Sequence, residues 1–304
     1  MEKHMLKKRK ANRTPKLFIT VCVLPAFLLT ALFLLWPTVQ VLWVSLTDAS
    51  LLRLDDANFV GLDNFRRMFG DRHFVQAVDN TVRLVLVVPI VTVALALLFA
   101  FLITQTKLKE RSLYRTTLFF PSIVSMVVIG IIWSFVFHPT MGILNTLLDN
   151  LGMTQLARTP WTGFAPTALW TVAAALIWQA AGYHMVIHIA AIDSISTDIF
   201  EASRIDGAGP LRQIFNITLP MIKNVVGITL IFAISGTLTH SFALTQIMTG
   251  GGPNGASRVL LLYIFEQGFR AGRFGYAMAI SAFTMAMAVL ISAILRWVTN
   301  RGKV

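Results

Sequence analysis

Histidines inside an apolar stretch are the residues of this chain with the plainest capacity for chemistry. His184 and His188 are four positions apart, so a helix would place them on one face. Imidazole binds metals, but a metal site needs further ligands, and no nearby stretch supplies a clear carboxylate. We therefore predict no bound metal. The two histidines are expected either to line a polar path or to bond to a neighbouring helix.

Hydrogen-bonding groups also gather beside aromatic rings in two of the apolar stretches. Sugar recognition uses paired polar groups next to an aromatic surface, which these stretches could supply. Hydrogen bonding between helices explains the same residues equally well. The candidates for a solute path are Gln179, Tyr183, His184, His240, Ser241 and Gln246.

Motifs for nucleotide or hydrolytic chemistry are missing from the sequence. It has no G-x-x-x-x-G-K-[ST] phosphate loop, because Gly250–Gly252 lacks the lysine that would follow. It also has no H-E-x-x-H and no G-x-S-x-G. Cys22 is the single cysteine, which rules out an intrachain disulfide and a cysteine-cluster metal site. If this chain takes part in an ATP-driven process, another polypeptide must bind the nucleotide.

A polar insert of twenty residues, EASRIDGAGPLRQIFNITLP, runs from Glu201 to Pro220. It reads as two short helices. Asp198 is expected to cap the first helix, with Glu201 as its reciprocal partner in a capping box. Gly207 can adopt the left-handed backbone of a helix end, and Pro210 fits the first position of the second helix. Pro220 is expected to end the insert before the next apolar run.

Composition identifies the rest of the chain as membrane protein. Of the 304 residues, 56% are hydrophobic and 13% are charged, with a formal net charge of +12. Soluble domains carry about 25% charged residues. The basic residues cluster at the ends of apolar runs, so they indicate orientation in a bilayer, and no nucleic-acid partner is expected.

Six stretches of at least 20 residues lack Asp, Glu, Lys and Arg, and each is long enough to cross a bilayer. They predict an all-α integral membrane protein with six transmembrane helices. The six stretches are Leu17–Thr47, Leu84–Ile103, Thr116–Phe137, Thr159–Ile192, Asn224–Ser257 and Phe274–Leu295.

The distribution of basic residues predicts the orientation of these helices. Segments on the side of both termini carry 17 Lys and Arg residues, and the opposite segments carry eight. This bias places both termini and the polar insert, between spans four and five, in the cytoplasm. Short amphipathic helices are expected on the outer side at Gly142–Leu151 and Leu260–Phe269.

Several motifs resemble one family. Glu201-Ala202-Ser203, then Gly207, then Ile217-x-Leu219-Pro220 resembles the "EAA" loop of bacterial ABC-importer permeases, which usually have Ala at the position of Ser203. The segments "FVGLDNF" at 59–65, Asn80-Thr81 and "TGGGP" at 249–253 resemble carbohydrate permeases of the maltose type, which depend on a binding protein. The resemblance runs from about Pro25 to the end of the sixth stretch.

The resemblance implies a multi-pass permease subunit in the bacterial cytoplasmic membrane, surrounded by lipid. Its partners would be a second homologous permease, a cytoplasmic ATPase dimer that binds ATP and Mg²⁺, and an external sugar-binding protein. Residues 1–16 would form a basic cytoplasmic tail, 17–298 the permease domain with a coupling loop at about 196–220, and 299–304 a second tail. The residues expected to couple to the ATPase are Glu201, Ala202, Ser203, Asp206, Gly207, Ile217, Leu219 and Pro220.

The substrate and two other functional classes stay open. A di- or oligosaccharide is the expected cargo, and glycerol phosphate is an alternative that the absence of a cationic span face disfavours. A secondary transporter usually has an acidic residue in a span, and none of the six stretches contains one. A scaffold or insertion factor without a substrate is the third class.

Overall fold

The computed structural model describes residues 16–50, 52, 56–105 and 110–300, and these form helices and connecting loops. Within these ranges there is no strand, and one isolated antiparallel bridge pairs Thr47 with Phe59. The first half contains α1 (Lys16–Thr30), the π-helical η1 (Ala31–Leu35), α2 (Trp36–Val44), α3 (Asp63–Gly70), α4 (Arg72–Gln105), α5 (Arg111–Phe119), the 3₁₀ turn η2 (Phe120–Ile123), α6 (Met126–Val136), α7 (Ile143–Asn150) and α8 (Thr154–Ala157). The second half contains α9 (Ala165–Asp193), α10 (Thr197–Ile205), α11 (Pro210–Gln213), the π-helical η3 (Ile214–Thr218), α12 (Leu219–Met248), α13 (Leu260–Phe265), the π-helical η4 (Glu266–Arg270) and α14 (Phe274–Asn300).

Five helical segments among the described residues are long and apolar enough to cross a membrane, and a bent pair of helices would make a sixth. The five are Thr20–Val44, Arg72–Thr104, Ala165–Asp193, Pro210–Met248 and Phe274–Ile294. Each overlaps a predicted stretch. Arg72–Thr104 and Pro210–Met248 begin before the predicted apolar residues, whereas Thr20–Val44 and Phe274–Ile294 lie within theirs. The predicted tail 1–16 lies, except for Lys16, outside the described residues, as do 301–304 of the second tail.

The third predicted span, Thr116–Phe137, is not one straight helix. Helix α5 with η2 and helix α6 meet at an angle of 102°. Pro121 lies in the 3₁₀ turn, and Val124 and Ser125 have extended ψ angles of 141° and 139°. Proline and two extended residues interrupt the ladder of helical hydrogen bonds, so the chain turns there. The sequence does not reveal this break, because the whole stretch is free of Asp, Glu, Lys and Arg and mostly apolar.

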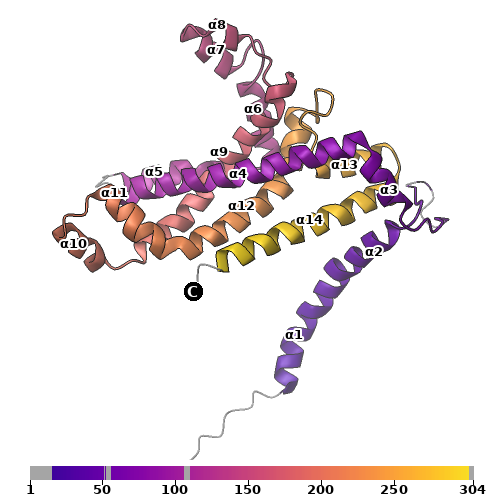
Figure 1. The fold of residues 1–304 in the computed structure, drawn as a ribbon, viewed down its shortest axis with the longest axis horizontal. Coiled ribbons are helices and arrows are strands. Elements are labelled where there is room, and N and C mark those ends of the chain that lie inside the picture. Colours follow the sequence, from indigo (N-terminus) through magenta and orange to yellow (C-terminus); the bar gives the residue numbers. More distant parts are fainter. Residues whose placement is uncertain (1–15, 51, 53–55, 106–109, 301–304) are drawn as a thin grey trace, which may run out of the picture.

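The helices α4, α9 and α12 pack side by side and form the centre of the molecule (Figure 1). One apolar cluster joins them to α6 through Leu84, Ile129, Val172 and Leu244, all of which are buried. A second cluster fills the end of the bundle near α10, and a third joins α3, α13 and α14 at the other end. These contacts fix the relative positions of the helices that carry the candidate site.

The two ends of the bundle differ in the segments that they carry. Helices α10 and α11 lie at one end, and α3 and α13 lie at the other (Figure 1). At the α10 end, the two carboxylate oxygens of Asp193 each accept a 2.9 Å hydrogen bond from Arg111. At the α3 end, the amide of Gly275 donates to the carbonyl of Ala49 at 2.8 Å. The polar insert and the loops near α3 and α13 therefore lie at opposite ends of the bundle, whereas α7 and α8 project away from it beyond α6 (Figure 1).

Helix α1 and its continuation through η1 diverge from the bundle (Figure 1). None of the most apolar window of Thr20–Val44 is buried in the chain, and Phe33 and Trp36 are exposed. The far end of this segment, α2, packs against the bundle, where it contacts α14. That contact is close, because a Cβ on Gly275 would lie 2.1 Å from the carbonyl oxygen of Thr47.

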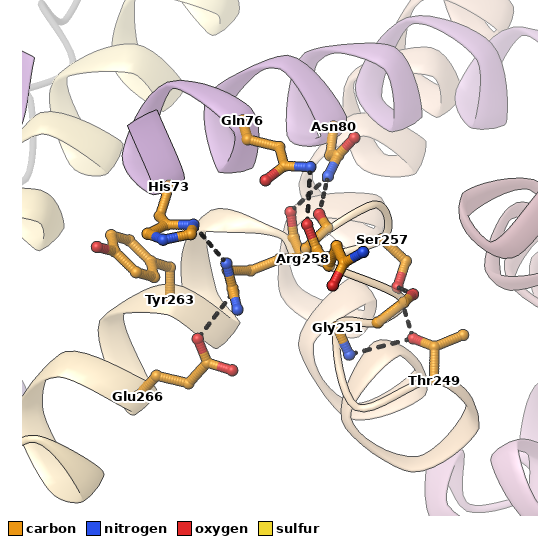
Figure 2. A network of polar contacts seen from close by, with 12 residues as sticks. His73, Gln76, Asn80, Thr249, Gly251, Ser257, Arg258, Tyr263 and Glu266 are labelled. Carbon is orange, nitrogen blue, oxygen red and sulfur yellow. Dashed lines mark hydrogen bonds and ion pairs between the residues drawn. The ribbon is translucent and has the colours of Figure 1, made fainter. Parts of the chain in front are cut away.

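The glycine-rich loop after α12 is tied to the first turns of α4 (Figure 2). The Asn80 amide donates to the carbonyls of Gly255 and Arg258, each at 2.9 Å. The hydroxyls of Thr249 and Ser257 bond to each other at 2.7 Å across the turn. The predicted turn at 249–253 is confirmed, and Asn80 is explained as its anchor.

Ionisable groups reinforce the same end of the bundle. Arg258 forms a 2.9 Å ion pair with Glu266 (Figure 2). Asp71, between α3 and α4, accepts hydrogen bonds from the hydroxyls of Tyr263 and Tyr276, the second at 2.8 Å. Burial raises the pKa of Asp71, but the two tyrosines and the backbone amides of the following turn lower it more, so its pKa falls below the usual value. Burial and the bond to Asp71 raise the pKa of Tyr263.

Candidate functional site

The polar segment, residues 196–220, begins with a capped helix. The cap of α10 is Ser196, whose hydroxyl accepts a 3.3 Å hydrogen bond from the amide of Asp198. The expected capping box of Asp198 and Glu201 is therefore wrong. Asp198 lies in the first helical turn, where its charge still favours the positive end of the helix dipole. The serine two residues upstream is an equally good cap by type, and only the backbone geometry selects it.

The end of α10 follows the prediction. Gly207 has φ +76°, the left-handed conformation that glycine adopts without steric cost. Its amide donates to the carbonyl of Arg204 at 3.0 Å, and the amide of Ala208 donates to the carbonyl of Ser203 at 2.8 Å. This pair of bonds is the Schellman arrangement that closes a helix.

The second helix of the polar segment merges with a membrane-length helix. Pro210 occupies the start of α11 as expected, and α11, η3 and α12 then form one continuous segment from Pro210 to Met248. Pro220 therefore does not end the insert. It lies in the first turn of α12, directly after the five-residue π turn, whose irregular backbone hydrogen bonding can accommodate a residue without an amide proton. The insert thus continues without a break into the fifth apolar helix.

The residues expected to couple to an ATPase divide by exposure. Four of them, in α10 and the turn that follows it, are exposed: Glu201, Ala202, Asp206 and Gly207. Ile217 and Leu219 are half-buried and Pro220 is exposed. Three apolar side chains nearby are also largely uncovered in this chain: Ile205 (88% exposed), Leu211 (71%) and Phe215 (63%). An apolar surface of this kind beside charged groups is typical of a contact with another protein.

Ser203 is the exception, because it is buried. Its hydroxyl accepts a 2.8 Å hydrogen bond from the side-chain amide of Gln213 and donates to the carbonyl of Phe200 at 2.8 Å. Gln213 is also buried, and the sequence reasoning missed it. The position of this polar residue next to the apolar Ile214 could have indicated a buried polar contact, but the sequence does not show that its partner is ten residues away.

A cavity of about 240 Å³ lies among the central helices. Polar and aromatic side chains from α9 and α12 face it, together with one residue of η2 and two of α4. The lining residues are Val88, Thr92, Ser122, Leu176, Gln179, Ala180, Tyr183, His184, Phe232, Ala233, Gly236, Thr237 and His240.

The structure brings four of the six solute-path candidates together at this cavity. Gln179, Tyr183, His184 and His240 all line it, although they come from two helices. The rings of Tyr183 and His184 are 5.2 Å apart and meet edge to face. Ser241 and Gln246 do not line it, and the Ser241 hydroxyl bonds within its own helix, to the carbonyl of Leu238 at 3.0 Å.

The two histidines of α9 have different surroundings. His184 lines the cavity, whereas the Nε2 atom of His188 bonds to the hydroxyl of Thr229 on α12 at 2.9 Å. The expected bond between helices is therefore made by His188, whereas His184 faces the cavity and its place on a solute path stays a prediction. Across the described ranges, no group of three or more His, Cys, Asp or Glu side chains could hold a metal ion.

Ser122 joins the broken third span to the cavity wall, and the sequence reasoning did not select it. Its hydroxyl donates to the carbonyl of Gln179 at 2.8 Å and accepts from the amide of Tyr183 at 3.0 Å. Gly182 makes this approach possible, because a Cβ there would lie 1.9 Å from the carbonyl oxygen of Leu118. The bend near Pro121 thus places a hydroxyl against the helix that lines the cavity.

The cavity has polar groups set in a mostly apolar lining, and none of its lining residues is Asp, Glu, Lys or Arg. Two of its buried polar atoms, Thr92 Oγ1 and His184 Nδ1, have no hydrogen-bond partner within the described part of the chain. Buried polar groups almost always have partners, so these two atoms mark places where a polar molecule would be stabilised.

Comparison with known proteins agrees with this arrangement. Residues 70–303 match the family described as "binding-protein-dependent transport system inner membrane component". The chain is 35% identical to the probable ABC transporter permease protein YurN of Bacillus subtilis over 78% of its own length and 81% of that protein. It is 33% identical to the diacetylchitobiose uptake system permease protein NgcF of Streptomyces coelicolor, over 89% and 78%.

A third relative and a solved structure extend the comparison. The sn-glycerol-3-phosphate transport system permease protein UgpA of Pectobacterium atrosepticum is 29% identical over 90% of this chain and 91% of the relative. The fold matches a chain of a bacterial alginate ABC transporter, solved with an alginate pentasaccharide-bound periplasmic protein, with a TM-score of 0.82. That match covers 94% and 95% of the two chains at 22% identity. The family resemblance found in the sequence is confirmed: this chain is a membrane permease of the binding-protein-dependent transport system inner membrane component family.

Proposed function

We propose that this chain is one of two membrane-spanning subunits of an ATP-driven importer, and that its cargo is an uncharged di- or oligosaccharide. The observation that carries the proposal is the cavity between α9 and α12, with its hydroxyl, amide and imidazole groups beside the rings of Tyr183 and Phe232. Sugars present several hydroxyl groups and apolar ring faces, and such a lining complements both.

The cargo of the relatives leaves two candidates, and the lining favours one of them. The Streptomyces relative is named for diacetylchitobiose uptake, and the Pectobacterium relative for sn-glycerol-3-phosphate transport. A phosphate ester is usually held by arginine, lysine or a helix N-terminus. The lining of this cavity contains neither basic residue, which supports the neutral sugar. Glycerol phosphate remains the second candidate cargo, because the Pectobacterium relative is named for its transport.

The polar segment would transmit the work of ATP hydrolysis. We infer that 196–220 docks into a groove of a cytoplasmic ATPase dimer that binds ATP and Mg²⁺. Exposed Glu201 and Asp206 would contribute charge, and Ile205, Leu211 and Phe215 the apolar contact that this chain leaves uncovered. Closure of the ATPase dimer would pull the polar segments of the two permease subunits together and turn the helices around the cavity.

The chain would have six spans, with α5–η2–α6 as a bent third span, and both termini in the cytoplasm.

Delivery of the sugar would take place at the opposite end of the bundle. The loop residues 47–50, 56–62 and 249–259, with α7, would face outward and receive an external sugar-binding protein. The alginate transporter of similar fold was solved with such a protein. A second, homologous permease would complete the path, and its interface would cover part of the exposed apolar surface of α1.

Uptake by cells tests the cargo. A strain lacking this gene, with and without the gene restored, is supplied with radiolabelled diacetylchitobiose or radiolabelled glycerol 3-phosphate. Gene-dependent uptake of the disaccharide, lost on treatment that depletes ATP, is expected. Uptake that instead collapses with a proton uncoupler while ATP is held constant would favour a secondary transporter. Gene-dependent uptake of glycerol 3-phosphate alone would mean that the cargo is this anion and not a neutral sugar.

Two threonines of α12 provide a matched test of the cavity. Thr237 lines it and donates to the carbonyl of Ala233 at 2.8 Å, whereas Thr239 lies outside and donates to the carbonyl of Ser235 at 3.0 Å. Both lose the same kind of backbone bond when changed to valine. Thr237→Val should lower disaccharide uptake severalfold, and Thr239→Val should not. Equal uptake by the two variants would remove the cavity from the path.

A bulky residue in the turn of the polar segment tests coupling. Gly207→Trp should leave the protein in the membrane but separate ATP hydrolysis from uptake, because a large side chain in a left-handed position would displace the docking surface. Normal uptake by vesicles that contain this variant would contradict the role of the segment. Labelling of Asp206→Cys from the outside of intact cells would contradict its cytoplasmic location.

A further inference from the structure

The two helices of the polar segment are held together by a buried side-chain contact. The Gln213 amide nitrogen donates to the Ser203 hydroxyl at 2.8 Å and to the Phe200 carbonyl at 3.3 Å. Ser203 is 8% exposed and Gln213 is 3% exposed. Along the chain, α10 continues into α11 through the glycine-containing turn at 206–209, and Phe200 of α10 also packs in the apolar cluster that contains Ile222 of α12. The glutamine thus connects the first helix to the second across that turn.

The same glutamine is also bound on its other side. Its backbone carbonyl accepts a 3.2 Å hydrogen bond from the hydroxyl of Thr218, which is fully buried. Thr218 is the last residue of the π turn η3, and α12 begins at the next residue. A π turn has an irregular pattern of backbone bonds and often occurs at functional positions in helices. Here a threonine side chain supplies a bond across the turn and supports it.

Helix α12 carries this connection to the cavity. The segment Pro210–Met248 is continuous over 39 residues, which corresponds to roughly 55–60 Å at 1.5 Å per residue. Its residues Phe232, Ala233, Gly236, Thr237 and His240 form one wall of the cavity. A displacement of the first turn of this segment therefore reaches the wall directly.

We propose that Ser203, Gln213 and Thr218 form a brace that makes α10 and α12 move as one rigid lever. This inference rests on the proposed coupling function of the polar segment. When a partner displaces α10, the brace passes the displacement to α12 and the cavity wall rather than letting the turn at 206–209 absorb it. Ser203, Gln213 and Thr218 act through the helices they join, so they are positioning residues.

The brace is specific to the residue at position 203. Where the family resemblance implies alanine, this chain has serine, and the serine oxygen is the nearer of the two acceptors of Gln213. Alanine at this position would leave the amide with the 3.3 Å contact alone. Loss of a buried bond of this kind shifts the equilibrium between a braced and a separated arrangement by about fivefold.

Spin-label distances test the rigidity of the lever without any substrate. Cys22 is the only cysteine, so Cys22→Ser allows labels to be placed at Asp198→Cys on α10 and Met221→Cys on α12, both exposed positions. In the full chain, reconstituted alone in nanodiscs, we expect one narrow distance distribution. Gln213→Met should broaden it, Ser203→Ala should broaden it less, and the double variant should match Gln213→Met because the two residues act as one unit. Distributions of equal width in all four proteins would overturn the brace.

Transport by the complete importer tests what the brace does. The importer is purified with its partner subunits and reconstituted in proteoliposomes. Uptake of diacetylchitobiose and ATP hydrolysis are measured together. Gln213→Met should lower the amount of sugar transported per ATP by about fivefold at equal membrane content, whereas Gln155→Met, an exposed glutamine on α8, should leave the ratio unchanged. A purely structural loss would lower both activities and keep their ratio.

The outcomes separate this inference from the function on which it rests. A broadened distance distribution with an unchanged ratio of transport to hydrolysis would refute the lever, while importer function would stand. A native importer that hydrolyses ATP without any stimulation or uptake of the sugar would refute the proposed function, and the inference with it.

Discussion

Gly182 is the position where a single methyl group should do the most damage to the cavity wall. It lies in the middle of α9, at the point where the backbone of α5 crosses. A Cβ at this position would be 1.9 Å from the carbonyl oxygen of Leu118, 2.7 Å from its carbonyl carbon and 2.8 Å from the Cα of Phe119. All three are backbone atoms, so no side-chain rotation can relieve the contact.

The size of the effect follows from this geometry. The two backbones would have to separate by about 1.1 Å before the shortest contact reached 3.0 Å, a distance below which real Cβ atoms essentially never approach other atoms. Overpacking in a well-packed interior costs about 1–3 kcal/mol, and a clash between two backbones belongs at the upper end. Alanine gains about 1 kcal/mol in helix propensity over glycine. We expect Gly182→Ala to lower the free energy of unfolding by about 2 kcal/mol.

Thermal unfolding of the purified full-length chain in detergent measures this change. A loss of about 2 kcal/mol corresponds to a fall in Tm of about 4–8 °C for a chain of this size class. Gly236→Ala on α12 is the matched control, because the nearest atom to its Cβ would be His240 Nδ1 at 3.9 Å. Its Tm should stay equal or rise slightly. Displacement of α5 would also weaken the two Ser122 bonds, so sugar uptake should fall in Gly182→Ala.

Equal melting temperatures for Gly182→Ala and Gly236→Ala would refute the reasoning. They would mean that the crossing of α5 over α9 is loose enough to admit a methyl group. A more damaging Gly236→Ala would show that the tight crossing lies on α12 instead.

Three further changes test other parts of the structure. Asp71→Asn should lower Tm near pH 7, and the difference in Tm from the native chain should shrink as the pH falls below about 4. A carboxylate whose pKa is lowered in the folded state stabilises the fold above its unfolded pKa of about 3.9, and this stabilisation is lost as the folded carboxylate is protonated. Thermal melts between pH 3 and pH 7 check this, and a difference in Tm that is independent of pH would contradict it. Gly207→Ala should lower the free energy of unfolding by about 1–2 kcal/mol, because Gly207 has a φ of +76°. Gly209→Ala should not change it measurably, because Gly209 has a φ of −70° and no atom lies near its Cβ position. Equal Tm values for the two variants would argue against the left-handed turn. A double-mutant cycle of His188→Leu with Thr229→Val should give a coupling of about 0.5–1.5 kcal/mol in unfolding experiments, and additive effects would mean that the bond between the helices contributes little.

Local rules explain why much of the architecture could be predicted. Apolar runs of span length need no tertiary information to be recognised, because a bilayer demands about 20 apolar residues in a helix. Gly207 and Pro210 act through their own backbone preferences, and the structure confirms both. The cap at Ser196 was missed because Ser and Asp are equivalent caps by type, and the choice depends on where the preceding helix ends.

The sequence alone therefore determined the helical membrane character of the chain, the position of its polar segment and the family motifs, because each depends on residues that are close together. The tertiary structure decided which polar residues meet. Gln179 and His240 line one cavity, whereas Ser241 and Gln246, equally polar and nearby in sequence, do not. The contacts of Ser203 with Gln213 and of Gly182 with Leu118 depend on how two helices cross, and no local preference encodes the angle or the rotation of that crossing.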